Sequence, residues 1–116
     1  MTRIPATPQP HVPAVPHFDL PDNACLVDVR EADEWDLGHA PGAVHLPLGE
    51  IEGRLDELPA DRPLVVTCRS GGRSSRAVAF LRESGYEAVN LDGGMLEWQR
   101  QNRPLTHDGH GQPLVR

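Results

Sequence analysis

The sequence predicts an α/β domain, with a mostly parallel sheet that carries helices on both faces. Short apolar runs alternate with amphipathic segments roughly every 20 residues, which is the pattern of repeated strand–helix units. Aromatic residues make up only 4% of the chain, so the core must be built from aliphatic side chains. A length of 116 residues suits one domain of this class.

The expected strands are brief runs rich in Val, Leu and Ala, as in strands that are buried on both faces. They cover residues 25–29, 43–46, 63–67 and 88–91. Residues 15–18 are a candidate short edge strand. The segment 19–24 is too short to hold a helix between that edge and the next strand.

The clearest helix begins at Ser74 or Ser75 and runs to residue 84, with Gly85 as its C-terminal cap. Ile51, Leu55 and Leu58 have helical spacing, which predicts a second helix over 50–58. A further helix is expected over 95–102, and a helical turn over 31–36.

The two ends of the chain differ from its middle. Residues 1–14 form a proline-rich arm that should be extended, because proline resists helix and lacks a backbone donor. Residues 106–116 are rich in Gly and polar residues, which predicts a loose C-terminal tail. The folded domain is therefore expected over 15–105.

Charge and hydropathy exclude several classes of protein. The net charge of −6 gives no broad attraction for nucleic acid or for an anionic membrane. No apolar stretch approaches the ~18 residues of a membrane span, and the first residues lack the pattern of a signal peptide. We therefore expect a cytoplasmic protein.

The segment with the strongest chemical signal is Cys68-Arg-Ser-Gly-Gly-Arg-Ser74, which joins a buried strand to the clearest helix. Ligands of parallel α/β sheets bind beyond the carboxyl ends of strands. Glycines allow successive N–H groups to converge on one point, and the helix N-terminus adds partial positive charge. With Arg69 and Arg73 nearby, Cys68 is expected to be a nucleophilic thiolate. The simpler interpretation is a helix start with Ser74 as its N-cap and a packed cysteine.

Three segments, in order, resemble the single-domain rhodanese family, the thiosulfate sulfurtransferases. They are the stretch Leu26-Val-Asp-Val-Arg-Glu31 with Glu34 and Gly38-His-Ala-Pro-Gly-Ala-Val-His-Leu-Pro47, the Cys68 loop, and Leu91-Asp-Gly-Gly-Met95 with Trp98. The resemblance implies the three-layer rhodanese-like fold, with a five-stranded sheet. It covers most of the chain.

The same resemblance implies a reaction. Cys68 would take sulfur from thiosulfate or a persulfide donor, release sulfite from thiosulfate, and pass the sulfur to cyanide, a thiol or a protein acceptor. The N–H groups of Ser70, Gly71, Gly72, Arg73 and Ser74 would hold the persulfide, and Arg69 would help bind the donor. Neither a metal nor an organic cofactor is implied.

Other polar residues are expected to be structural. Asp28 and Arg30 suggest an ion pair that fixes the following turn, although they stand near the same sheet edge and contact with the substrate remains an alternative. His39 is expected to be part of a turn, Cys25 a small buried residue, and Trp98 the core residue of the last helix. His107 and His110 lack a third metal ligand.

Two other functions compete with sulfur transfer. A cysteine phosphatase or arsenate reductase also joins Cys to Arg, usually across five residues, whereas four separate Cys68 from Arg73 here. A non-catalytic rhodanese-like module is the other alternative, although such modules typically lack the cysteine.

Overall fold

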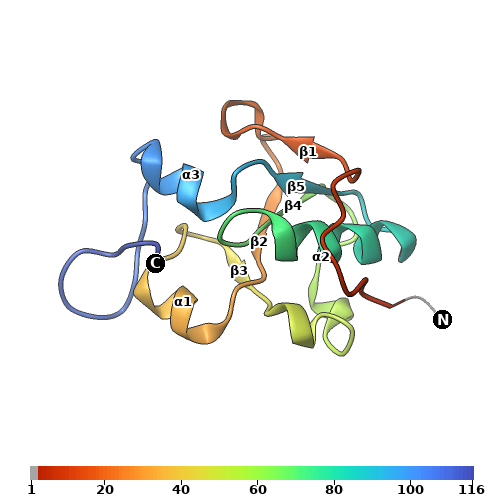
Figure 1. Ribbon diagram of the computed structural model, residues 1–116, viewed down its shortest axis with the longest axis horizontal. Coiled ribbons are helices and arrows are strands. Elements are labelled where there is room, and N and C mark those ends of the chain that lie inside the picture. Colours follow the sequence, from red (N-terminus) through yellow and green to blue (C-terminus); the bar gives the residue numbers. More distant parts are fainter. Residues whose placement is uncertain (1–2) are drawn as a thin grey trace.

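The computed structural model describes residues 3–116 and places five parallel strands in one sheet, in the order β1-β5-β4-β2-β3 (Figure 1). The strands are β1 (Ala14–Val15), β2 (Cys25–Asp28), β3 (Val44–His45), β4 (Leu64–Thr67) and β5 (Ala88–Leu91). The predicted five-stranded parallel sheet is therefore confirmed. Strand β4 lies at its centre, between β5 and β2.

Three α-helices accompany the sheet: α1 (Ala32–Leu37), α2 (Gly72–Glu83) and α3 (Gly94–Arg100). Short 3-10 turns follow β1, at His17–Asp19, and β3, at Leu48–Glu50 and Leu55–Glu57. None of these helices, within residues 3–116, is long and apolar enough to cross a membrane.

Alternate side chains of the central strands enter two separate cores. Val66 packs with the cluster that includes Val78 and Leu81 of α2, here called the α2 core. Val65 packs with the cluster that includes Met95 and Trp98 of α3, here called the α3 core. Successive side chains of a strand point to opposite faces of the sheet. The predicted helical cover on both faces is therefore confirmed.

The predicted helix over 50–58 is wrong. Ile51 and Leu58 are buried as expected, but they are carried by 3-10 turns and bends. The amide of Arg54 donates to Ile51 and that of Leu58 to Leu55, each three residues back. Gly53 interrupts the segment, and a glycine inside an α-helix costs about 1 kcal/mol relative to alanine.

Two boundaries differ from expectation at the ends of elements. Helix α2 begins at Gly72 rather than at Ser74 or Ser75, because left-handed Gly71 precedes it and accepts a hydrogen bond from the Ser75 amide. The edge strand lies at Ala14–Val15 instead of 15–18. Phe18 instead belongs to a 3-10 turn and is 88% exposed.

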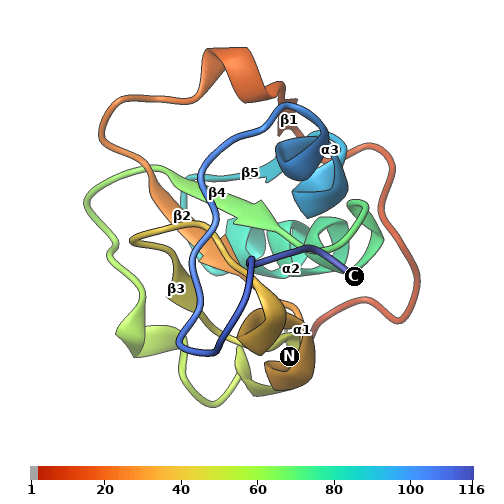
Figure 2. The same cartoon turned by 90° about the vertical axis from the view of Figure 1, so that its left-hand side faces the viewer.

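The C-terminal tail packs against the domain, so the expectation of a loose tail is wrong. Figure 2 shows the dark blue tail returning across the molecule to the neighbourhood of α1 and α2. Val115 is buried in the α3 core, and Gln99 binds both its amide and its carbonyl. The amide of Leu114 donates to Leu37 at the end of α1.

The proline-rich arm contains no helix over residues 3–14, but it bends at residues 6–7 and turns at 10–12, where the Val12 amide donates to the Gln9 carbonyl. The arm is held against the domain. Ser75 accepts a hydrogen bond from the Gln9 amide, and Arg76 donates to the carbonyl of Pro5. Both partners belong to α2, so the arm runs beside that helix (Figure 2).

Candidate active site

Cys68 is the first residue after central strand β4, and its side chain is only 1% exposed. The amide of Gly71 donates to its Sγ at 3.1 Å, and the amide of Ser74 does so at 3.4 Å. The Ser74 hydroxyl oxygen lies 3.3 Å from the same sulfur. These three groups, together called the sulfur cradle, lie around Sγ, and the two amides direct their hydrogens at it.

Gly71 gives the loop its sharp turn. Its φ of +116° is a conformation that L side chains rarely adopt, and it lies immediately before α2. The turn brings the first amides of α2 back over the cysteine. Ser74 is therefore inside the helix rather than at its N-cap, and the simpler interpretation of the loop is wrong on that point.

Helix α3 fixes the loop from the side of β5. The amides of Met95 and Leu96 donate to the carbonyls of Cys68 and Arg69, at 2.8 and 3.0 Å. This approach requires a glycine at position 94, because a Cβ there would lie 2.6 Å from the Arg69 carbonyl oxygen. Gly94 also has a φ of +59°.

Arg73 makes a two-pronged ion pair with Glu34 of α1, at 2.7 and 2.8 Å. The carboxylate is buried, and the Arg73 guanidinium holds the pKa of Glu34 at about 2. Glu34 also accepts the Glu31 amide in a capping box at the start of α1. Arg73 therefore ties the loop to α1.

Arg69 and Ser70 are the exposed members of the loop. The Arg69 Nε donates to the main-chain oxygen of Arg116 at 2.7 Å, and the Arg116 guanidinium pairs with Asp33. Ser70, Gly71 and Gly72 also line a hollow of about 240 Å³ whose other wall is the proline-rich arm. The structure thus gathers all seven predicted site residues, but it pairs both arginines with protein groups.

The predicted ion pair of Asp28 and Arg30 is confirmed. Both side chains are fully buried, and Arg30 binds the carboxylate at 2.7 to 3.1 Å and the Gly38 carbonyl at 2.8 Å. His39 has the expected turn role, since its Nδ1 lies 2.8 Å from the Trp35 carbonyl and its ring stacks on that indole.

The remaining sequence assignments fall outside the loop. Cys25 is buried in the α2 core as a free thiol, and Trp98 is buried in the α3 core, as predicted. His107 contacts the carbonyl of Gly111 within the tail.

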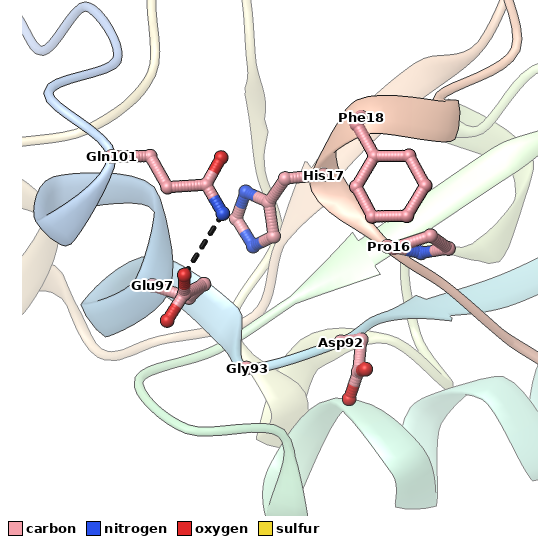
Figure 3. Close-up of a pocket in the computed structure, with 7 residues that line it drawn as sticks. All are labelled: Pro16, His17, Phe18, Asp92, Gly93, Glu97 and Gln101. Atoms are coloured by element: carbon pink, nitrogen blue, oxygen red, sulfur yellow. Dashed lines mark hydrogen bonds between the residues drawn. The ribbon is translucent and has the colours of Figure 1, made fainter.

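A second hollow, of about 250 Å³, lies beyond the end of β5 (Figure 3). His17 forms part of its wall, and neither ring nitrogen has a hydrogen-bond partner among residues 3–116. Burial lowers the pKa of His17 below its ordinary value. Figure 3 shows Asp92, Glu97 and Gln101 around it, with Gln101 bonded to Glu97. Cys68 does not line this hollow.

Sequence reasoning included Glu34 in the family resemblance but did not predict its contact with Arg73, and it missed Asn90. Asn90, in β5, binds the loop at Gly71 and Ser74. The only available signal for Asn90 was polarity, since it is a polar residue inside an apolar strand segment.

Comparison with known proteins identifies the family. The sequence model of the rhodanese-like domain matches residues 17–101. A protein of Allochromatium vinosum named sulfurtransferase is 42% identical over 86 residues, covering 73% of this chain and 80% of that protein. A Mycobacterium tuberculosis protein, named HTH-type transcriptional regulator Rv0324, is also 42% identical, but the match covers only 40% of its length.

Solved structures give the same assignment. The crystal structure of a rhodanese-related protein from Thermoplasma volcanium superposes with a TM-score of 0.78 at 28% identity, over 83% of this chain and 99% of that one. A rhodanese-like domain protein from Staphylococcus aureus superposes with a TM-score of 0.72 at 26% identity, over 84% of this chain and 99% of that one. The family match, the related sequences and the shared fold together show that this chain belongs to the rhodanese-like domain family.

Proposed function

We propose that the protein is a sulfurtransferase that carries sulfur as a persulfide on Cys68. The observation that carries the proposal is the sulfur cradle. Two amides converge on one buried sulfur, and donors directed at an anion stabilise it strongly where water is excluded. The sulfurtransferase name of the Allochromatium vinosum relative supports the same reaction class.

The proposed reaction has two displacements at sulfur. The Cys68 thiolate attacks the outer sulfur of thiosulfate, a bond forms between the two sulfurs, and sulfite leaves with the electron pair of the broken bond. A cyanide ion or thiolate then attacks the outer sulfur of the persulfide and restores the Cys68 thiolate. Charge balances in each step, and no oxidant or reductant is required.

Arg69 is the proposed contact for the anionic donor. It is exposed beside the cradle, and only its Nε is occupied by a described residue, the main-chain oxygen of Arg116. The other N–H groups of the guanidinium are suited to a sulfonate oxygen. Arg73 instead supports the loop, because its guanidinium already faces Glu34.

The acceptor is proposed only by chemical class, as a thiophilic small molecule or a protein thiol. A protein acceptor is consistent with two relatives. The name of Bacillus subtilis YrkF includes the words sulfur carrier protein, and that of Mycobacterium tuberculosis MoeZ includes adenylyltransferase/sulfurtransferase. The match to this chain covers 44% of the first and 21% of the second.

The decisive experiment is the intact mass of the protein after incubation with thiosulfate. Wild type should gain one sulfur atom and lose it again on addition of cyanide, with release of thiocyanate. Cys68→Ser should gain none, whereas Cys25→Ser, which changes a cysteine in the α2 core, should behave as wild type. Loss of loading in a folded Cys25→Ser variant, but not in Cys68→Ser, would contradict the proposal.

The same samples test the phosphatase alternative. A phosphoryl group brings three equatorial oxygens, each needing donors at about 2.7–3.1 Å, whereas the cradle directs its donors at the cysteine sulfur itself. Turnover of an aryl phosphate should therefore not exceed that of Cys68→Ser. Cys68-dependent hydrolysis without any thiocyanate formation would favour the phosphatase.

A further inference from the structure

Asn90 contacts both residues whose amides point at the reactive sulfur. It lies in β5, directly beside Val66 of β4. Its Nδ2 donates to the Gly71 carbonyl at 3.1 Å, and its Oδ1 lies 2.5 Å from the Ser74 hydroxyl oxygen. The side chain thus closes a ring that runs from Sγ through Gly71, Asn90 and Ser74 back to Sγ.

The amide group of Asn90 can face the loop in only one way. The Gly71 carbonyl can only accept, so the NH₂ group must point toward it and Oδ1 toward Ser74. The Ser74 hydroxyl has a single proton and three acceptors in reach: Asn90 Oδ1 at 2.5 Å, the Gly71 carbonyl at 3.2 Å and Cys68 Sγ at 3.3 Å. The shortest of these contacts directs that proton to Asn90.

The amides and the hydroxyl of the sulfur cradle therefore have different roles. With its proton on Asn90, the Ser74 hydroxyl presents a lone pair to Sγ, so negative charge on sulfur depends on the amides of Gly71 and Ser74. Gly71 has a left-handed φ, and its carbonyl is bound by Asn90. Loss of that bond would remove the contact through which β5 holds the residue that supplies the closer amide, and would leave the Ser75 amide of α2 as the backbone partner of the Gly71 carbonyl.

We propose that Asn90 is a positioning residue for the sulfur-carrying loop, which holds the amides of Gly71 and Ser74 on Cys68 Sγ without touching the sulfur. The inference deepens the proposed function and rests on it for its role in sulfur transfer. The geometric part can be tested separately, through the reactivity of the Cys68 thiolate toward a neutral alkylating agent.

Asn90→Asp is the most informative variant. A carboxylate can still accept from Ser74, but it repels the Gly71 carbonyl. A protonated Asp has a donor again and copies both contacts of Asn90. With the ionised carboxylate, the Gly71 amide should no longer be held on the Cys68 thiolate, and a hydrogen bond to a charged group is large enough for a tenfold effect. At about pH 8, alkylation of Cys68 by iodoacetamide should therefore be at least about tenfold slower than in wild type. The ratio of variant to wild-type rates should then rise toward one as the pH falls to about 5.

Val89→Ala supplies the matched control on the same strand. Val89 packs in the α3 core, on the face of the sheet opposite Cys68. This variant should have a lower melting temperature than wild type but the same pH profile of alkylation. A merely structural role of Asn90 predicts the same behaviour for Asn90→Asp, so the profile separates the two roles.

The outcomes are decisive in each direction. If folded Asn90→Asp is alkylated like wild type at both pH values, the positioning role is overturned, whatever thiosulfate loading shows. If Asn90→Asp does not fold, Asn90→Ala decides: slow alkylation at both pH values supports the role, and wild-type alkylation overturns it. If wild type accepts no sulfur but Asn90→Asp shows the pH-dependent loss, the positioning role stands and the proposed function fails.

Discussion

Glu34→Gln isolates the charge that ties α1 to the active-site loop. Glutamine is isosteric and can keep the capping box with Glu31, so the change removes the ion pair to Arg73 and little else. The pKa of Glu34 falls from 4.5 to about 2 in the folded chain. A shift of that size corresponds to about 3 kcal/mol at neutral pH.

Solvent reduces this figure, since the Arg73 side chain is 31% exposed although that of Glu34 is only 11% exposed. We therefore expect Glu34→Gln to lower the free energy of unfolding by about 1–2 kcal/mol at pH 7. In a chain of 116 residues, the melting temperature should fall by about 4–8 °C.

The pH dependence has a definite sign. The folded-state pKa of Glu34 is depressed, so its contribution is complete above the unfolded value of 4.5 and is lost as the pH falls toward 2. Urea denaturation from about pH 7 to pH 3 should therefore show the difference between wild type and Glu34→Gln shrinking at the acid end. Asp36→Asn changes an exposed residue of the same helix, so its free energy of unfolding should stay close to that of wild type over the whole pH range. If Glu34→Gln lowers the free energy of unfolding equally at both ends of the pH range, the reasoning is refuted.

Three further changes test the supports of the loop. Deleting residues 112–116 removes buried Val115 and should lower the free energy of unfolding by about 1.5–3 kcal/mol in urea denaturation; an unchanged midpoint would mean that the tail is not packed in solution. Gly94→Ala places a Cβ against the Arg69 carbonyl oxygen, so it should lower both the melting temperature and the rate of sulfur loading measured by mass. Arg69→Ala should raise the apparent KM for thiosulfate by about tenfold or more, and a wild-type KM would assign Arg69 to the tail alone.

The parts of the site that the sequence predicted are local. Cys68 stands at the end of an apolar run, and Gly71 and Gly72 follow within four residues, so one short segment holds both the nucleophile and its turn. The structure adds the left-handed conformation of Gly71 and the two amides on Sγ. Local backbone preferences are enough to anticipate such a loop.

The missed parts depend on residues that are far apart in the chain. Arg73 and Glu34 are 39 positions apart, and Arg69 and Arg116 are 47 apart. No periodicity or motif carries such a pairing, because the topology of the sheet decides which segments meet. The predicted helix over 50–58 is wrong for a different reason. Apolar residues at helical spacing can also be buried by successive 3-10 turns, and Gly53 favours such turns over an α-helix.

The order of the sheet explains why the loop has supports on both sides. Parallel strands place their carboxyl ends at one edge, and β4 lies between β5 and β2. The chain leaving β5 supplies Gly94 and the first amides of α3, which bind the loop carbonyls. The chain leaving β2 supplies Glu34, which binds Arg73. Because the groups that hold the Cys68 loop come from the two strands beside it, its geometry is set by the central position of β4 as much as by its own sequence.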